Sequence, residues 1–150
     1  ESAPDPTAEL LLYAADRAQH VERMIRPALE RGDWVLSDRF SGSTIAYQGD
    51  GRGLNLQTIL DLERIATAGI TPDVTLWLDL PLQESLRRRG ARADDRIEAE
   101  GESFLMRVAE GFKRLSAERG WIPVEADQGA EQVQHIIRRL LEDHFAQALP

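Results

Sequence analysis

Residues 38–54 carry a dense set of side chains that can bind a phosphorylated ligand. Asp38 and Arg39 directly follow an apolar run, Trp34-Val35-Leu36, that predicts a buried strand, and four hydroxyl groups and an amide come next. Ligands of open α/β sheets bind beyond the carboxyl ends of the strands. An arginine fork suits phosphate oxygens, and hydroxyl and amide groups suit the polar edge of a ring. The segment therefore favours a ligand site over an ordinary Gly/Ser-rich surface loop.

A second concentration of charge lies at residues 87–96, which contain Arg87, Arg88, Arg89, Arg92 and Arg96. The formal net charge of the chain is −8. This charge argues against a nucleic-acid polymer as partner, because neutralising its phosphates needs a broad basic surface. A local arginine cluster instead suits a compact polyphosphate. The alternative is a solvated helix end, where arginines complement the helix dipole.

Composition predicts one globular domain. The chain has 150 residues, 42% of them hydrophobic, and no cysteine. The absence of cysteine excludes disulfides and thiolate metal sites and is compatible with a reducing compartment. No apolar stretch approaches the ~20 residues of a membrane span, and the start lacks a signal-peptide pattern. We expect a cytoplasmic protein without a membrane partner.

Elements that would position these residues alternate between helices and strands, which predicts an α/β fold with a parallel sheet. Helical spacing of apolar residues begins at Thr7, the expected N-cap, and ends at Gly32, and Asn55 is expected to cap a second helix. Strands are predicted at residues 34–37, 74–80 (a buried one) and 121–125, further helices at 55–68, 81–89, 97–119 and 130–146, and a loop at 38–54.

The order of motifs resembles bacterial thymidylate kinases. Asp38-Arg39-Phe40 is followed by Ser43-Thr44, Ala46-Tyr47-Gln48-Gly49 and Gly51-Arg52-Gly53-Leu54, in the order found in that family. Upstream, Glu9 to Val21 resembles the family's nucleobase-binding helix, and downstream residues 71–79 and 95–98 follow in order. The resemblance covers nearly the whole chain. It implies a P-loop NTPase-like three-layer fold with a parallel sheet.

One part of the family pattern is missing from these residues. A kinase of this fold needs a phosphate-binding loop of the form Gly-x-x-x-x-Gly-Lys-Ser/Thr, and the one lysine here, Lys113, lies in a helical run without such a loop. The resemblance implies that the family's first strand and phosphate loop precede the region matching Glu9 onward. We therefore expect residues 1–150 to be a single domain forming the C-terminal two-thirds of a thymidylate kinase, inactive as this chain alone.

The resemblance implies a nucleoside monophosphate kinase that transfers the γ-phosphate of ATP to dTMP and gives dTDP, with Mg²⁺ as cofactor. Its partners would be dTMP, ATP and, as is typical of the family, a second copy in a homodimer built on the first two long helices. The runner-up is a deoxynucleotide-binding fragment or homologue without catalysis. A third interpretation is a non-catalytic homologue that acts through protein interactions.

Family roles can be assigned to residues that match the motifs. Arg39 would hold the acceptor phosphate. Asp38 would orient Arg39 or reach a magnesium-bound water, or else cap the next turn. Tyr13 and Arg17 lie four residues apart on one helix face. By resemblance, Tyr13 would stack on a pyrimidine and Arg17 would donate to a ring carbonyl.

The remaining assignments concern the base, the sugar and the donor. By resemblance, Ser43, Thr44 and Gln48 would bind the edge of thymine, and Tyr47 would disfavour a 2′-hydroxyl group. A lid at about residues 87–97 would bring two catalytic, ATP-binding arginines, Arg92 and Arg96, onto the ATP phosphates. Asp127 would lie in an adenine-contacting turn. Arg52 serves either the phosphate or carbonyls of its own turn. The three histidines are expected to be structural, and no residue is expected to ligate a metal directly.

Overall fold

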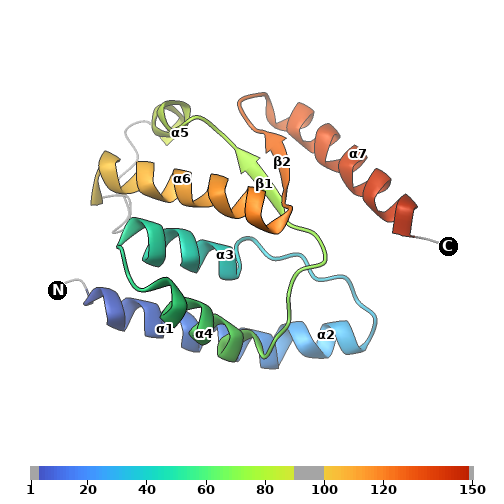
Figure 1. The fold of residues 1–150 in the computed structure, drawn as a ribbon. Coiled ribbons are helices and arrows are strands. Elements are labelled where there is room, and N and C mark those ends of the chain that lie inside the picture. Colours follow the sequence, from blue (N-terminus) through green and yellow to red (C-terminus); the bar gives the residue numbers. More distant parts are fainter. Residues whose placement is uncertain (1–3, 90–99, 149–150) are drawn as a thin grey trace. The chain divides into compact units, whose positions relative to one another are not determined.

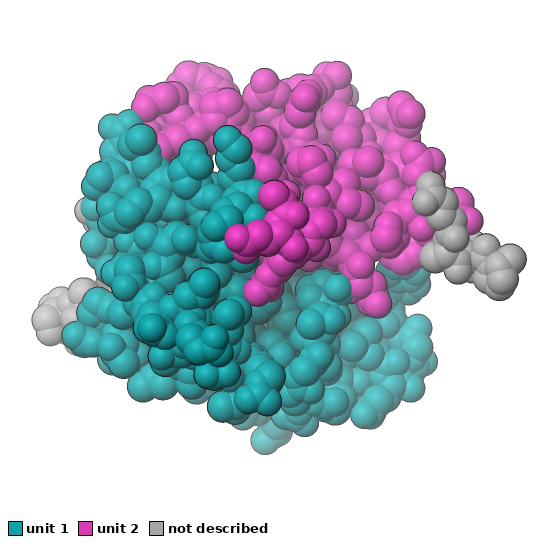
Figure 2. Space-filling view, viewed as in Figure 1, with its two compact units in different colours: residues 1–72, 94–115 teal, residues 73–93, 116–150 magenta. Residues whose placement is uncertain are grey.

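The computed structural model describes residues 4–89 and 100–148, except for the side chains of Arg89, Gln147 and Ala148. Helices predominate in this part of the chain, and two strands form a parallel sheet (Figure 1), which confirms the expected α/β class. The chain divides into two compact units, coloured separately in Figure 2. Unit 1 comprises residues 1–72 and 94–115, and unit 2 comprises residues 73–93 and 116–150.

The helical N-terminal segment of unit 1 confirms the predicted helix and corrects its cap. It consists of α1 (Pro6–His20), the π-helical turn η1 (Val21–Ile25) and α2 (Arg26–Glu30). Asp5, not Thr7, is the N-cap, because its carboxylate accepts a hydrogen bond from the backbone N–H of Thr7 at 2.9 Å. Pro6, which has no N–H to lose, therefore occupies the first helical position.

The segment predicted as a loop at 38–54 is mostly helical. It contains α3 (Ser41–Thr44) and the π-helix η2 (Ile45–Gly51). Ile45 and Ala46 are fully buried, so the segment packs into the core like an ordinary helix despite its Gly/Ser-rich composition. A helical backbone also satisfies its own N–H and C=O groups, which a buried loop could not do.

Two helices hold this segment in place within unit 1. Helix α4 (Leu56–Thr67) packs on α1 and begins as predicted at Asn55, whose side chain accepts from the Thr58 N–H at 2.9 Å. Helix α6 (Glu102–Arg119) contributes Arg107, which donates to the Gly51 carbonyl through Nη2 at 2.8 Å and Nε at 3.1 Å. The ring of Phe104 occupies the space where a Cβ of residue 51 would stand, so a glycine is required for this close approach.

The predicted strand at 34–37 is wrong. These residues form no regular element and do not join the ladder of the described sheet, which has two strands rather than the expected three. Trp34 is 80% exposed and Leu36 fully exposed. A run of apolar residues becomes a strand only when its main chain pairs with a neighbouring strand, and no described residue supplies that pairing here.

Unit 2 contains the sheet. Strands β1 (Leu76–Asp79) and β2 (Ile122–Glu125) pair in parallel, with Leu76 opposite Ile122 and Asp79 opposite Glu125. Both lie inside predicted strands, but β1 is less buried than expected because Leu78 is half-exposed. The other helices of the unit are α5 (Leu82–Arg89) and α7 (Ala130–Ala148), close to their predicted bounds. No helix of the described chain has both the length and the apolar character needed to cross a membrane.

Candidate functional site

A cavity of about 250 Å³ opens in unit 1 between one face of α1 and the segment that runs from Ser37 to Gln48. The α1 residues follow helical spacing, at positions 13, 16, 17 and 20, so they share one face. The full lining consists of Tyr13, Asp16, Arg17, His20, Ser37, Asp38, Arg39, Phe40, Ser43, Thr44, Tyr47 and Gln48. Two segments that are separate in the sequence therefore build one concave, polar site.

Every residue predicted to bind the substrate lines this cavity, and so does Asp38. Arg92 and Arg96 lie outside the described residues, as does most of the predicted lid. Asp127 lies in unit 2, exposed in the turn after β2. The structure thus brings together the residues assigned to the acceptor and does not describe an assembled donor site.

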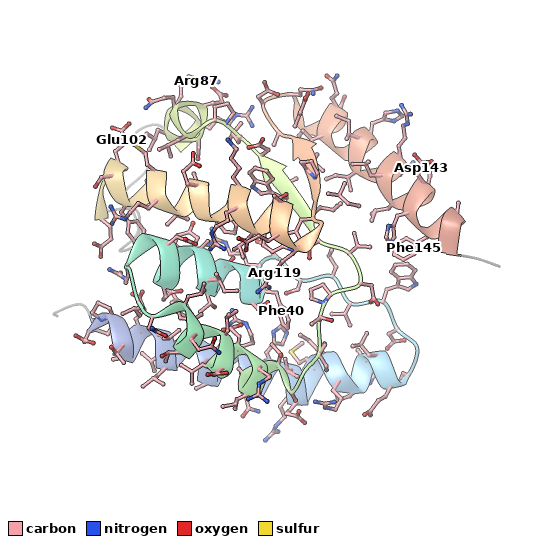
Figure 3. All side chains as sticks on the ribbon, viewed as in Figure 1. Phe40, Arg87, Glu102, Arg119, Asp143 and Phe145 are labelled. Atoms are coloured by element: carbon pink, nitrogen blue, oxygen red, sulfur yellow. The ribbon has the colours of Figure 1, made fainter. Side chains whose placement is uncertain are left out.

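Arg17 is held firmly at the cavity wall. Its Nη1 donates to Thr44 Oγ1 at 2.8 Å and to Glu63 Oε1 at 2.6 Å, and its Nη2 donates to the Phe40 carbonyl at 3.2 Å. Figure 3 labels Phe40, whose ring centroid lies 5.7 Å from the Arg17 Cζ. The two side chains of the Arg17–Glu63 ion pair are only 13% and 6% exposed. These contacts fix the plane of the guanidinium group.

Gln48 is held by a second buried carboxylate. Its Nε2 donates to Glu9 Oε1 at 2.9 Å. Arg52 donates to the same carboxylate through Nε at 2.8 Å and Nη2 at 3.1 Å, and to Glu100 through Nη1 at 2.9 Å. The bonds to Glu9 raise the pKa of Arg52 above its usual value. Arg52 therefore connects the end of η2 to α1. Its contacts are to carboxylates, and not to a phosphate or to carbonyls of its own turn, the two roles that the sequence left open.

Arg39 combines an unusual backbone with an exposed side chain. Its φ is +69°, a left-handed conformation that a non-glycine residue rarely adopts, and its carbonyl accepts from Ser37 Oγ at 2.8 Å. Its Cζ lies 5.1 Å from the Tyr47 ring centroid, within the range of a cation–π contact. Among the described residues no acid pairs with its guanidinium, which is therefore available to an anion in the cavity.

Asp38 is exposed at the cavity and does not cap α3, whose N-cap is Phe40 without a side-chain hydrogen bond. The capping interpretation of Asp38 is therefore wrong. Within residues 4–89 and 100–148, no group of three or more acidic or histidine side chains is placed to hold a metal ion. Asp38 can thus contribute one carboxylate to a metal site whose other ligands would come from substrate phosphates and water.

Sequence reasoning missed several residues of the site. Asp16 and His20 follow Tyr13 by three and seven positions, so the helical period that placed Arg17 beside Tyr13 would also have placed them. His20, expected to be structural, lines the cavity. Glu63 and Glu9 were missed as partners of Arg17 and Gln48. The sequence feature that could have indicated them is an acidic residue on the mostly apolar face of a helix.

Unit 2 shows how part of the predicted arginine cluster is bound. Glu84 accepts from Arg87 at 2.6 and 2.7 Å and from Arg88 at 2.7 Å, and these bonds lower the pKa of Glu84 to about 2. Arg88 also donates to the Ala126 carbonyl at 2.8 Å, next to Asp127. One carboxylate thus partly compensates the two guanidinium groups, and Arg88 anchors the turn after β2.

Comparisons with known proteins show which family the sequence matches. The family profile described as Thymidylate kinase matches residues 1–137. A protein named thymidylate kinase from Synechococcus sp. (strain WH7803) is 66% identical over 146 residues, which cover 97% of this chain and 68% of the relative. Proteins of the same name from Prochlorococcus marinus (strain MIT 9313) and Synechococcus sp. (strain CC9605) are 63% and 64% identical, each over 97% of this chain and over 67% and 70% of the relative. The chain therefore belongs to the thymidylate kinase family, whose members are nucleoside monophosphate kinases of the P-loop NTPase fold with ATP as phosphate donor.

Proposed function

We propose that the cavity of unit 1 is the dTMP site of this kinase and that the reaction transfers the γ-phosphate of ATP to dTMP, giving dTDP. One observation carries the proposal: α1 and residues 37–48 place every predicted acceptor-binding side chain around a single cavity. Phosphoryl transfer asks the protein mainly for positioning and for positive charge around the phosphate. The cavity offers both, since Arg17 is fixed by hydrogen bonds and Arg39 is exposed.

Arg39 is the proposed ligand of the dTMP phosphate. A guanidinium group can form two parallel hydrogen bonds to phosphate oxygens. The position of Arg39 over the Tyr47 ring keeps it at the cavity without committing it to an acid of the described chain. Phosphate binding therefore costs no broken ion pair.

Arg17, Thr44, Ser43 and Gln48 are the proposed ligands of the thymine edge, and Tyr13 is the proposed stacking surface. Thymine presents carbonyl acceptors and one N–H donor, so it needs both donors and acceptors from the protein. Arg17 can only donate, whereas hydroxyl and amide groups can do either. Tyr13 shares the cavity face of α1 with Arg17, which gives an aromatic ring beside the edge-binding groups.

Tyr47 is the proposed sugar-selecting residue. Its ring lies 6.2 Å from the Phe104 ring centroid and 6.0 Å from that of Phe112, in tilted and edge-on geometries. A ring held by two aromatic neighbours cannot easily move away from a 2′-hydroxyl group. Selection of deoxyribose would then come from a clash rather than from an attractive contact.

The donor side of the reaction is proposed from the sequence. Mg²⁺ commonly binds one or two carboxylates together with substrate phosphates and several waters. Asp38, an exposed carboxylate at the cavity, fits that mode and would hold the ion through water. The bound ion would neutralise charge on the phosphates of ATP. Arg92 and Arg96 are proposed to close on those phosphates, and Asp127 to lie at the adenine.

A homodimer is proposed as the assembly, built on α1 and α4. These helices pack against each other and leave large apolar side chains in contact with solvent, among them Leu12 (64% exposed) and Ile65 (70% exposed). Large exposed apolar side chains are typical of protein interfaces. A single domain and a cytoplasmic location remain predictions of the sequence.

ADP release by the full-length protein tests the function. The assay uses ATP and Mg²⁺ with dTMP, dUMP or dCMP as acceptor. We expect the highest kcat/KM with dTMP. Without an acceptor, we expect no ADP release above background. Absence of ADP release with all three nucleotides would overturn the kinase proposal and favour a deoxynucleotide-binding homologue.

A further inference from the structure

Two groups proposed to bind the base, Arg17 and Gln48, each bond to a buried carboxylate that does not line the cavity. Glu63 lies on α4 and Glu9 on α1, and both are almost fully buried. We propose that Glu63 and Glu9 are positioning residues that set the donor–acceptor polarity with which the cavity selects a pyrimidine. This inference rests on the proposed assignment of the cavity to dTMP.

Glu63 sets the donor side. Its Oε1 and Thr44 Oγ1 both accept from Nη1 of Arg17, which uses the two hydrogens of that nitrogen. The Phe40 carbonyl accepts one hydrogen of Nη2. Because these three acceptors fix the planar group, the remaining N–H groups have a fixed direction and cannot rotate to follow a different base. The buried carboxylate also balances a buried positive charge, so Arg17 need not turn toward water.

Glu9 sets the acceptor side. An amide can present either its NH₂ group or its carbonyl oxygen to a ligand, and the two ends are similar in size. Glu9 bonds to two nitrogens of Arg52 and is therefore a carboxylate, which only accepts. The NH₂ end of Gln48 must then face Glu9, as observed at 2.9 Å. The carbonyl Oε1 lies on the other side of the planar amide, away from Glu9.

Together the two carboxylates fix the direction of the remaining donors of Arg17 and of the acceptor of Gln48. Thymine and uracil carry an acceptor at O4 and a donor at N3, which complement that pair. Cytosine carries the reverse, a donor at N4 and an acceptor at N3. A cytosine ring would leave both protein groups facing groups of like polarity, and such mismatches at a buried site strongly disfavour binding. Glu9 and Glu63 would therefore select against dCMP without touching it.

Isosteric variants of the full-length protein test the inference. Glu9→Gln and Glu63→Gln are compared with Glu110→Gln, a matched control at an exposed acid of α6, outside the cavity and outside the proposed dimer surface. An amide at position 9 can pair with either end of Gln48, and an amide at position 63 loses the charge that holds Arg17. In both variants we expect the ratio of kcat/KM for dTMP to that for dCMP to fall by about tenfold, through a higher KM for dTMP.

Other readouts separate positioning from a merely structural role. A merely structural role would reduce the amount of folded protein, which lowers the apparent kcat for both nucleotides and leaves each KM and the dTMP to dCMP ratio of kcat/KM unchanged. That pattern in the variants would overturn the inference. The KM for ATP should stay at the wild-type value, as should every constant of Glu110→Gln. If a Gln variant fails to fold, Glu9→Asp or Glu63→Asp replaces it. The shorter side chain withdraws the carboxylate by one methylene, so the same fall in ratio is expected.

The outcome also separates this inference from the proposed function. A wild-type protein without activity on dTMP would remove the proposed function itself. A wild-type protein that prefers dTMP, with variants that keep its dTMP to dCMP ratio, would remove only the roles of Glu9 and Glu63.

Discussion

Arg39 is strained in its backbone and exposed in its side chain, so its two properties can be tested separately. We expect Arg39→Ala to remove dTMP turnover while the fold persists, because the side chain makes no described ion pair. Arg39→Gly should lose turnover equally but unfold with a free energy about 1 kcal/mol higher than the alanine variant, since glycine accepts the positive φ without strain. Steady-state kinetics and urea unfolding measure both.

Arg39→Lys serves as the control for charge. It keeps one positive charge and loses the fork that binds two oxygens, so its kcat/KM for dTMP should lie below that of wild type and above the background level of Arg39→Ala. Near-normal turnover of Arg39→Ala would contradict the phosphate role.

Glu84 gives a prediction about pH. Hydrogen bonds from Arg87 and Arg88 lower its pKa from 4.5 to about 2. A lowered folded-state pKa means that these contacts stabilise the fold fully above the unfolded value, near 4.5, and lose that contribution as the pH falls toward about 2. NMR titration of the Glu84 carboxyl group should give this low midpoint, and Arg87→Ala should raise it. A midpoint unchanged by Arg87→Ala would show that the pair does not persist in solution.

At the level of single residues, the sequence predicted the groups that face the cavity better than the groups behind them. Tyr13, Arg17 and Arg39 belong to short motifs whose residue types match the chemistry of a nucleotide. Glu63 and Glu9 accept hydrogen bonds from Arg17 and Gln48, which lie 46 and 39 residues away in the sequence. Only the packing of α4 against both α1 and η2 brings them together, and no local spacing encodes that packing.

Helix α4 supplies a prediction at the level of an element. Its N-cap Asn55 accepts from the N–H and the hydroxyl of Thr58, at 2.9 and 3.1 Å. We expect Asn55→Ala to lower the free energy of unfolding by about 0.5–2 kcal/mol, whereas Asn55→Asp should retain most of it because aspartate caps equally well. Chemical denaturation monitored by circular dichroism measures both variants. Equal stability of the two would show that the cap contributes little.

Elements were predictable where local chemistry decides them. The periods of α1, α4 and α7 and the Asn55 cap are properties of the segments themselves. Residues 34–37 have strand-like composition, yet a strand also depends on a neighbour that a local pattern does not reveal. For residues 41–51 the error was the opposite one, since a regular element formed where a loop was predicted. Their glycines and serines suggested a loop, while burial of Ile45 and Ala46 made a helical backbone the favourable form.

At the scale of the whole molecule, the proposed dimer predicts an effect on self-association. Leu12→Asp places a charge in the exposed apolar surface of α1, so we expect it to shift the protein from dimer to monomer, because burying an unpaired charge is costly. Met106→Asp is the matched control, since Met106 is a similarly exposed apolar residue on α6. Light scattering after size-exclusion chromatography gives the masses. A wild-type monomer, or a dimer unaffected by Leu12→Asp, would rule out this interface.

Helix α1 bears on two processes at once. One face carries Tyr13 and Arg17 at the cavity, and the same helix exposes Leu11 and Leu12 to solvent. If those leucines meet a second copy, any shift of α1 on association also shifts the groups that bind the base. Thermodynamic reciprocity then requires that dTMP change the association constant by the same factor by which association changes the affinity for dTMP. In such a protein, the apparent affinity for the nucleotide becomes a function of protein concentration.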